Sequence, residues 1–340
     1  MKFKTDSCIR IPLKYRDEGW FVSVVRTLTR TETKYHNRSE CNIKKYYVAD
    51  PRTDELLIPR FYDISSIAKL DDQIVDGEDI KIKSKTKPRN DRQKESMEWM
   101  VKNDSGILCL QPGEGKTVIT ILSICKLKKK SIIFVHKDSL ITQWKAKFLE
   151  HSDIKESDIG RLSTKTYKTD ITKPIVLSTV QTYCNIIDKS PELVDEMKSF
   201  GIAVWDECHT SVSAETFSKT SLYTPVKRRF GLSATPSRSD NNTDIMNMHL
   251  GDVFKPESSG IDTMDPKIVM VKFDHGVMGK HKNYIMHMTK YDFSKKIFPY
   301  FDKSRYLKFL TKSKVYLKHI QKIVSQIYKS DRNMLFLSDR

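Results

Sequence analysis

Five short apolar runs, separated mostly by segments of helical length, dominate residues 93–240. The runs are Ile107–Leu110, Ile132–His136, Ile175–Ser178, Ile202–Trp205 and Phe230–Ser233. Strands that alternate with helices pair in parallel, and helices then cover both faces of the sheet. The pattern therefore predicts an α/β fold class, with a parallel-sheet domain over residues 87–265.

The chain before this domain has a different character. Residues 1–62 carry three short runs typical of strands, Trp20–Val25, Tyr46–Ala49 and Leu56–Tyr62, between turn-like stretches. Acidic residues then cluster in 63–79 and basic residues in 81–92, a switch that usually marks a solvated linker. We expect a small β-containing N-terminal domain over residues 1–86, with DNA binding as its role.

The C-terminal quarter is strongly basic. Residues 266–340 hold 17 Lys and Arg against five Asp and no Glu. Apolar residues at helical spacing in 315–328 predict a basic helical connecting segment over 266–330. The last apolar run, Met334–Leu337, resembles a buried strand without a sheet to join. We therefore expect residues 331–340 to begin a further domain and the chain to be a truncation of a longer protein.

Composition limits the partners and the compartment. The formal net charge of +17 favours a polyanionic partner, although a lysine-rich solvated surface is an open alternative. The six cysteines form no C-x-x-C pair, which argues against a zinc site and for a reducing compartment. Neither a signal peptide nor an apolar run of membrane-spanning length is present. We expect a soluble intracellular protein, located in the host cytoplasm if its source is viral, without a membrane partner.

A glycine-rich loop follows the first apolar run. The sequence Leu110-Gln-Pro-Gly113-Glu114-Gly115-Lys116-Thr117 leads into a helix-forming run that begins at Val118. Glycines let backbone N–H groups surround phosphate oxygens, and the helix N-terminus adds positive potential there. Lys116 is expected to reach the β- and γ-phosphates, and Thr117 to bind Mg²⁺. Leu110 replaces the first glycine of the usual motif, so a plain glycine turn is the alternative interpretation.

Two acids end the fourth run, at Asp206 and Glu207. A buried strand would place them at the carboxyl edge of the sheet, where ligands bind in such folds. Asp206 is suited to the Mg²⁺ shell, and Glu207 to orienting and deprotonating the attacking water. Taken alone, the two acids also fit a helix N-cap and a first-turn carboxylate. The upstream phosphate loop favours the catalytic interpretation, with Lys116, Asp206 and Glu207 as catalytic residues.

These motifs together resemble the superfamily-2 helicase motor. Gln93, GEGKT at 113–117, DECH at 206–209 and SAT at 233–235 occur in its order and spacing. The segment 135–148 and the extension 234–238 resemble the XPB and phage UvsW group, and the plan is also similar to branch-migrating helicases of T5-like phages. The resemblance implies a RecA-like lobe that uses ATP and Mg²⁺, and a second RecA-like lobe, largely missing from this chain, that would supply arginine fingers.

The resemblance also implies individual roles. Gln93 resembles the adenine-reading glutamine, although Asp91 and Arg92 replace its usual aromatic neighbour. The expected nucleotide-binding set is Gln93, Gly113, Glu114, Gly115, Lys116, Thr117 and Val118. Residues that resemble the groups coupling hydrolysis to motion are His209, Ser233 and Thr235. Residues that resemble strand-backbone contacts are Lys137, Thr179 and Gln181.

A further nucleic-acid contact is expected from the residues themselves. Lysines alternate in the basic run, so an extended chain would present Lys81, Lys83, Lys85 and Lys87 on one side. We therefore expect an ATP-dependent DNA helicase or translocase that unwinds or branch-migrates forked or junction DNA, as a monomer. The alternatives are an RNA helicase, an accessory protein with a vestigial nucleotide site, and a protein-export motor.

Overall fold

The computed structural model describes residues 1–33, 41–208, 214–234 and 243–258, together with a few positions beyond (289–290, 300–301, 318, 321–322 and 325). The chain forms two compact units, Met1–Asp262 and Thr263–Arg340. In the second unit, β15 (Thr289–Lys290) pairs with β16 (Tyr300–Phe301) in antiparallel fashion. Most of the predicted connecting segment at 266–330, and all of 331–340, lie outside the described residues.

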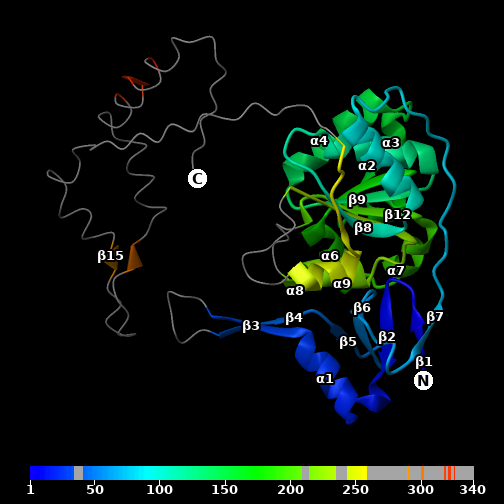
Figure 1. Cartoon of the computed structure of the whole chain (residues 1–340), viewed down its shortest axis with the longest axis vertical. Coiled ribbons are helices and arrows are strands. Elements are labelled where there is room, and N and C mark those ends of the chain that lie inside the picture. The colour runs from blue at the N-terminus through cyan, green and yellow to red at the C-terminus, as the bar shows by residue number, and fades with distance from the viewer. Residues whose placement is uncertain are drawn as a thin grey trace. The chain divides into compact units, whose positions relative to one another are not determined.

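A seven-stranded sheet forms the centre of the first unit (Figure 1). In sheet order its strands are β10 (Ile159–Arg161), β11 (Ile175–Thr179), β9 (Ser131–Val135), β12 (Ile202–Trp205), β13 (Arg228–Ser233), β8 (Ser105–Cys109) and β14 (Val253–Phe254). Every pair is parallel. The five predicted strands and the parallel α/β lobe are confirmed. The two edge strands have only two or three residues, too few for a recognisable pattern.

Alternate residues of these strands pack into two separate cores. Ile133 and Val135 face one core, whereas Ile132 and Phe134 face the other, as the two-residue period of a strand requires. The helices over the first face are α2 (Asp91–Lys102), α3 (Lys116–Leu127) and α4 (Asp138–His151). Helices over the second are α6 (Val180–Lys189), α7 (Leu193–Glu196), α8 (Ala214–Leu222) and α9 (Thr243–Leu250), and a short α5 (Tyr167–Asp170) follows β10. No helix in the described ranges is long and apolar enough to cross a bilayer.

The N-terminal residues build a second sheet. Its order is β5 (Val48–Asp50), β6 (Glu55–Pro59), β2 (Cys8–Pro12), β1 (Lys2–Thr5) and β7 (Lys69–Asp72). A hairpin of β3 (Thr29–Thr33) and β4 (Cys41–Lys45) stands apart from it. The prediction of a small N-terminal β-containing part is confirmed in fold.

The predicted strand at Trp20–Val25 is wrong, because these residues lie in α1 (Gly19–Thr27). The apolar residues of this run fit the spacing of a helix as well as the alternation of a strand. Phe21 and Val24, three residues apart, are the buried side chains of this helix, so burial at helical spacing outweighs the strand propensity of the valines.

Residues 73–90, which we call the strap, join the two sheets; most of their side chains are at least partly exposed, as the predicted solvated linker requires, but the strap is also bonded to the lobe. The strap lies along the RecA-like lobe and forms backbone hydrogen bonds from Ile80 N–H to the Lys128 carbonyl (2.8 Å) and from Lys85 N–H to the His151 carbonyl (2.9 Å). Ile82 is only 2% exposed and belongs to the core under α2, α3 and α4. One buried isoleucine among the five basic residues of the strap is a weak sequence signal, because runs of charged residues usually lie in solvent.

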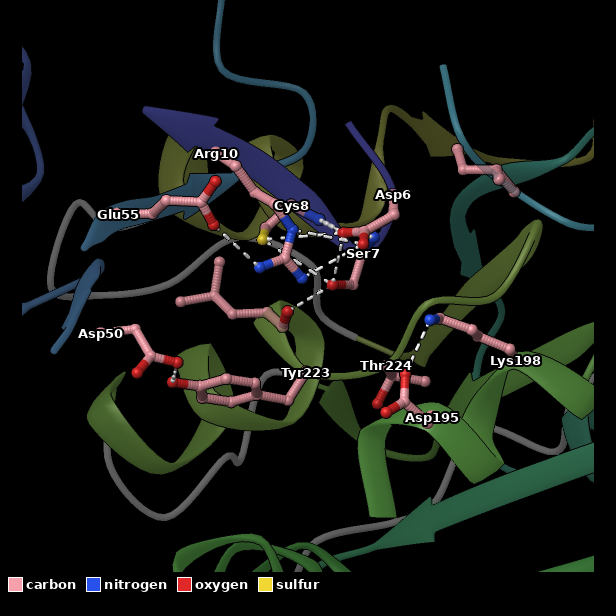
Figure 2. A network of polar contacts seen from close by, with 12 residues as sticks. Asp6, Ser7, Cys8, Arg10, Asp50, Glu55, Asp195, Lys198, Tyr223 and Thr224 are labelled. Carbon is pink, nitrogen blue, oxygen red and sulfur yellow. Dashed lines mark hydrogen bonds and ion pairs between the residues drawn. The ribbon is translucent and has the colours of Figure 1, made fainter. Parts of the chain in front are cut away.

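The N-terminal sheet docks on the amino edge of the lobe, which is the edge where the parallel strands begin. Ser7 donates its hydroxyl hydrogen to the Leu222 carbonyl, and Arg10 binds both Asp6 (3.1 Å) and Glu55 (3.3 Å) beside it (Figure 2). Further contacts run from Arg60 to the Val226 carbonyl (3.0 Å) and from the Tyr223 hydroxyl to Asp50 (3.4 Å). The phosphate loop follows β8, so it lies at the opposite edge.

Behind this interface, Arg229 and His249 are both buried. Arg229 donates to the carbonyls of His249 and Thr224, each at 3.2 Å, and burial lowers the pKa of its guanidinium. The two imidazole nitrogens of His249 lie 2.6 Å from the Ser221 hydroxyl and 3.3 Å from the Ser218 hydroxyl. These partners suit a neutral imidazole, which has one donor and one acceptor.

The buried imidazole predicts a stability that depends on pH. Burial, reinforced by Arg229, lowers the pKa of His249 to about 3 from 6.5. Between these two pKa values the unfolded chain therefore binds more protons at His249 than the folded protein does. The contribution of His249 to stability is complete above pH 6.5 and falls as the pH decreases. We expect the free energy of unfolding to drop by about 1 kcal/mol per pH unit between about pH 6 and 5, measured by urea denaturation. His249→Gln should flatten this slope, and an equal slope in that variant would contradict the assignment.

Candidate nucleotide-binding site

The glycine-rich loop connects β8 to α3 at the carboxyl edge of the sheet. Gly113 and Gly115 have φ values of 84° and 92°, a left-handed backbone that favours glycine. Gly115 is the N-cap residue of α3, and Lys116 is its first residue. The loop thus turns its backbone at the N-terminus of a twelve-residue helix, the geometry that binds phosphate.

Gln93 packs directly against this loop and is 2% exposed. Its amide donates to the Glu114 carbonyl (2.9 Å) and accepts from the Arg89 N–H (3.0 Å). Arg92 forms an ion pair with the Glu114 carboxylate at 2.7 Å, and Arg89 donates to the Gly113 carbonyl at 3.2 Å. Arg89 from the end of the strap, and Arg92 and Gln93 from the first turn of α2, therefore fix the conformation of the loop.

The sequence identified Gln93 and Glu114 but missed Arg89 and Arg92. The nearest signal was Asn90, which accepts a hydrogen bond from the Gln93 N–H (2.9 Å) as the N-cap of α2. A helix that starts there brings Arg89 and Arg92 within reach of the loop. Arg92 pairs with Glu114, twenty-two residues further along the chain, and no local sequence pattern reveals this pairing.

The two loop glycines provide a matched pair of variants. A Cβ at Gly115 would meet Gln93 Nε2 at 2.5 Å, whereas a Cβ at Gly113 meets nothing within 4 Å. Gly113→Ala should therefore cost only the left-handed backbone strain, about 1–2 kcal/mol. Gly115→Ala should cost more and should also displace Gln93, reducing the preference for ATP over GTP. Thermal unfolding and the two nucleotide affinities measure this, and equal behaviour of both variants would contradict it.

The acidic pair lies after β12, two strands away from β8 in the sheet. The Asp206 carboxylate accepts from the Trp144 indole N–H (2.8 Å) and from the Glu207 backbone N–H (3.0 Å). Glu207 has a φ of 47°, a left-handed conformation that is uncommon outside glycine. The strand end and this backbone turn set the two carboxylates at the carboxyl edge.

Lys116 brings the loop and the acidic pair together. Its ammonium donates to the Leu110 carbonyl at 3.1 Å and lies 3.9 Å from a Glu207 carboxylate oxygen. Burial, followed by the like charge of Glu207, raises the pKa of Asp206, and the Trp144 hydrogen bond opposes this rise. A half-buried carboxylate with a raised pKa has too little positive charge around it to balance its own, which suits a site that receives a cation.

The donor set fits Mg²⁺ bound to a nucleotide. Asp206 has a carboxylate with free lone pairs, and Thr117 carries a hydroxyl at the start of α3. Mg²⁺ prefers such oxygen ligands, with one or two from the protein and others from phosphates. The described residues include no cluster of three or more His, Cys, Asp or Glu that would form an all-protein metal cage. Thr117 and Asp206 would hold the ion.

The predicted coupling residues are described only in part. Ser233 is fully buried at the end of β13, where its carbonyl accepts from the Leu110 N–H (3.0 Å). It therefore lies beside the root of the phosphate loop. His209 and Thr235 lie outside the described residues, and their roles stay predictions.

The three residues predicted to contact the backbone of a nucleic-acid strand also lie at the carboxyl edge of the sheet. Lys137 is exposed and occupies the N-cap position of α4. Thr179 caps α6 by accepting from the Thr182 N–H at 3.1 Å, and Gln181 is exposed in the first turn of that helix. The ends of β9 and β11 bring them to one edge, although more than 40 residues separate Lys137 from the other two in sequence.

The lysine row, Lys81, Lys83, Lys85 and Lys87, lies elsewhere. All four side chains are exposed, and Ile82 points inward between the first two. The row runs beside the C-terminal ends of α3 and α4, since residues 80–85 bond to Lys128, His151 and Asp153. It therefore starts at the amino edge, roughly 18 Å from the phosphate loop by the length of α3. The structure does not bring it together with Lys137, Thr179 and Gln181.

The family and the relatives agree with this geometry. The model of the family described as "Type III restriction enzyme, res subunit" matches residues 62–238. The XPB2 protein of Sulfurisphaera tokodaii, named a DNA 3'-5' translocase, is 30% identical over 172 residues, covering 51% of this chain and 36% of that protein. L396 of Acanthamoeba polyphaga mimivirus, named as a candidate ATP-dependent RNA helicase, is 26% identical over 290 residues, covering 83% and 52%.

A solved structure shows the same fold. The UvsW helicase of bacteriophage T4 superposes with a TM-score of 0.53 at 20% identity, over 75% of this chain and all of that chain. The matched regions span only about a third to a half of the curated relatives XPB2 and L396. The family match covers more than half of this chain, so the chain belongs to the type III restriction enzyme res-subunit family.

Proposed function

We propose that this chain contains the ATP-binding lobe of an ATP-dependent DNA helicase or translocase that unwinds or branch-migrates forked or junction DNA. The observation that carries the proposal is the meeting of Lys116 and Glu207 at 3.9 Å. The two residues come from different strands, at the edge where the loop glycines and Asp206 also lie. A basic phosphate-binding group beside a carboxylate is the minimum that nucleotide hydrolysis requires.

Each residue has a distinct part in the proposed reaction. The loop N–H groups and Lys116 bind the β- and γ-phosphates. Gln93 contacts the adenine from α2, where its side chain is fixed against the loop. Thr117 and Asp206 would hold Mg²⁺, which would supply positive charge to the phosphates. Glu207 takes a proton from the water that attacks the γ-phosphate. Ser233, which lies beside the phosphate loop, passes the conformational change that accompanies ATP hydrolysis to the rest of the motor.

ATP hydrolysis measured with different nucleic acids tests the proposal. Single strands, duplexes, forks and four-way junctions should be compared in DNA and RNA versions. Stimulation by forked or junction DNA above duplex DNA is the expected result. Hydrolysis that no nucleic acid stimulates would contradict it, and would favour an accessory protein with a nucleotide site.

An RNA helicase is the second candidate, favoured by the similarity to L396 over most of the chain. The described lobe would contact phosphates, which DNA and RNA share, so the ribose hydroxyl has to be read locally. Stronger stimulation by RNA than by the matching DNA would select this candidate.

The lysine row is proposed as a second contact, to a duplex held apart from the motor strand. Nearby lysines are neutralised, for example Lys129 by Asp76 (2.9 Å) and Lys145 by Glu156 (2.8 Å). None of the four lysines of the row forms an ion pair within the part of the chain that the structure describes. The strap fixes the backbone that carries these lysines, and the Lys85 ammonium also donates to the Leu149 carbonyl at 3.0 Å.

Replacing the four lysines of the row with glutamine should weaken duplex binding similarly for all sequences. The slope of log affinity against log salt should flatten by up to about 0.9 for each phosphate that is no longer neutralised. A control with the same charge change replaces four paired lysines, Lys145, Lys147, Lys198 and Lys219. Fluorescence anisotropy at several salt concentrations measures both. An unchanged slope, or an equal change in the control, would contradict the proposed role of the row.

A further inference from the structure

Hydrogen bonds from two parts of the lobe hold both oxygens of the Asp206 carboxylate. The Trp144 indole N–H donates to Oδ2 at 2.8 Å, and the Glu207 N–H donates to Oδ1 at 3.0 Å. The second bond is local to the turn after β12. The first comes from the middle of α4, 62 residues earlier in the chain, so its presence depends on how α4 packs on the sheet.

Trp144 itself is fixed by the core. Its side chain is 2% exposed, and its ring lies 6.1 Å from that of Phe148, one turn further along α4. A buried tryptophan contributes a large apolar surface and one N–H group that needs a partner. Here the apolar part is anchored among the residues between α4 and the sheet, and the N–H group reaches out to the acidic pair.

We propose that Trp144 is a positioning residue, which orients the Asp206 carboxylate for the Mg²⁺ that accompanies the nucleotide. This inference rests on the proposed function. Donors that bind a metal-ligating carboxylate fix its orientation, and their loss typically lowers metal affinity by about 10–100-fold. Each carboxylate oxygen accepts one of these two hydrogen bonds and keeps a lone pair for the ion.

A role in packing alone makes a different prediction. If only the volume of the indole mattered, its removal would destabilise the lobe in the same way as the loss of any neighbouring aromatic side chain. Phe148 provides that comparison, because it is 0% exposed, lies in the same helix and contacts the same core. It carries no polar atom and forms no hydrogen bond through its side chain.

The test compares Trp144→Phe with Phe148→Leu in the 340-residue protein. Binding of a fluorescent ATP analogue is measured in excess EDTA and then at increasing Mg²⁺. Trp144→Phe should leave the EDTA affinity unchanged and raise the half-saturating Mg²⁺ concentration by about 10-fold or more. Phe148→Leu should lower the melting temperature without moving that concentration. Half-saturation at the wild-type concentration in Trp144→Phe, or an equal shift in Phe148→Leu, would overturn the inference.

A second measurement does not require a folded Trp144 variant. The indole N–H signals of the wild-type protein are recorded by ¹⁵N NMR and assigned with variants of Trp20, Trp99 and Trp205, so that Trp144 follows by elimination. Its signal should move when Mg²⁺ is added to the nucleotide-bound protein, and an unmoved signal would overturn the inference. If the wild-type protein shows no Mg²⁺-dependent nucleotide binding, the proposed function fails as well. A failure confined to the Trp144 signal or variant leaves that function intact.

Discussion

Glu207→Gln is expected to lower the rate of ATP hydrolysis by about 10²–10⁴-fold, the usual contribution of a general base, while ATP binding is retained. Glutamine has the same shape, so it should keep the left-handed turn at φ 47° and the backbone hydrogen bond to Asp206. It cannot accept the proton of the attacking water. Phosphate release with single-stranded DNA present measures turnover, and a fluorescent nucleotide measures binding.

The control for this variant is Glu156→Gln, the same chemical change at an exposed carboxylate that pairs with Lys145 at 2.8 Å. It should leave both measurements unchanged. Turnover near the wild-type rate in Glu207→Gln would remove Glu207 from the catalytic role. Loss of ATP binding would instead show that its carboxylate mainly supports Lys116.

Lys116→Ala should abolish measurable hydrolysis and also weaken ATP binding. No other basic side chain in the described loop reaches the same position, and the ammonium already lies between the Leu110 carbonyl and Glu207. Losing one preorganised group that stabilises transferring charge costs about 10²–10³-fold in rate, to which the weaker binding adds. Isothermal titration with ATP and phosphate release together measure the two effects.

Lys126→Ala, near the other end of α3, is the matched control. It removes the same kind of charge from the same helix, away from the loop, and should behave as the wild type. Hydrolysis by Lys116→Ala at more than a tenth of the wild-type rate would refute the assignment of the phosphate loop.

The nucleotide site was largely predictable from the sequence because its chemistry restricts the residue types. Gly113 and Gly115 need a left-handed backbone, which the structure gives them. Lys116 and Glu207, although 91 residues apart, meet because each directly follows a strand of one parallel sheet or its loop. Parallel strands collect such positions at a single edge, so strand prediction was enough to bring them together.

Contacts without a local pattern were not predictable. Trp144 looks like any core residue of an amphipathic helix, and only the packed structure shows its N–H group on Asp206. Ile82 is a single buried position in a charged run. Ser7 and Leu222 meet where the N-terminal sheet docks on the lobe, and neither periodicity nor spacing in the sequence connects them.

The N-terminal sheet is synthesised well before the part of the lobe that covers it. Ser7 finds the Leu222 carbonyl 215 residues later, which corresponds to roughly 10–40 s of synthesis at about 5–20 residues per second. During that interval Cys8 and Leu57, both 0% exposed in the finished fold, lack the α8 and β13 region that buries them. The yield of folded protein in a cell should therefore depend on the rate of translation and on chaperones, as well as on the final stability.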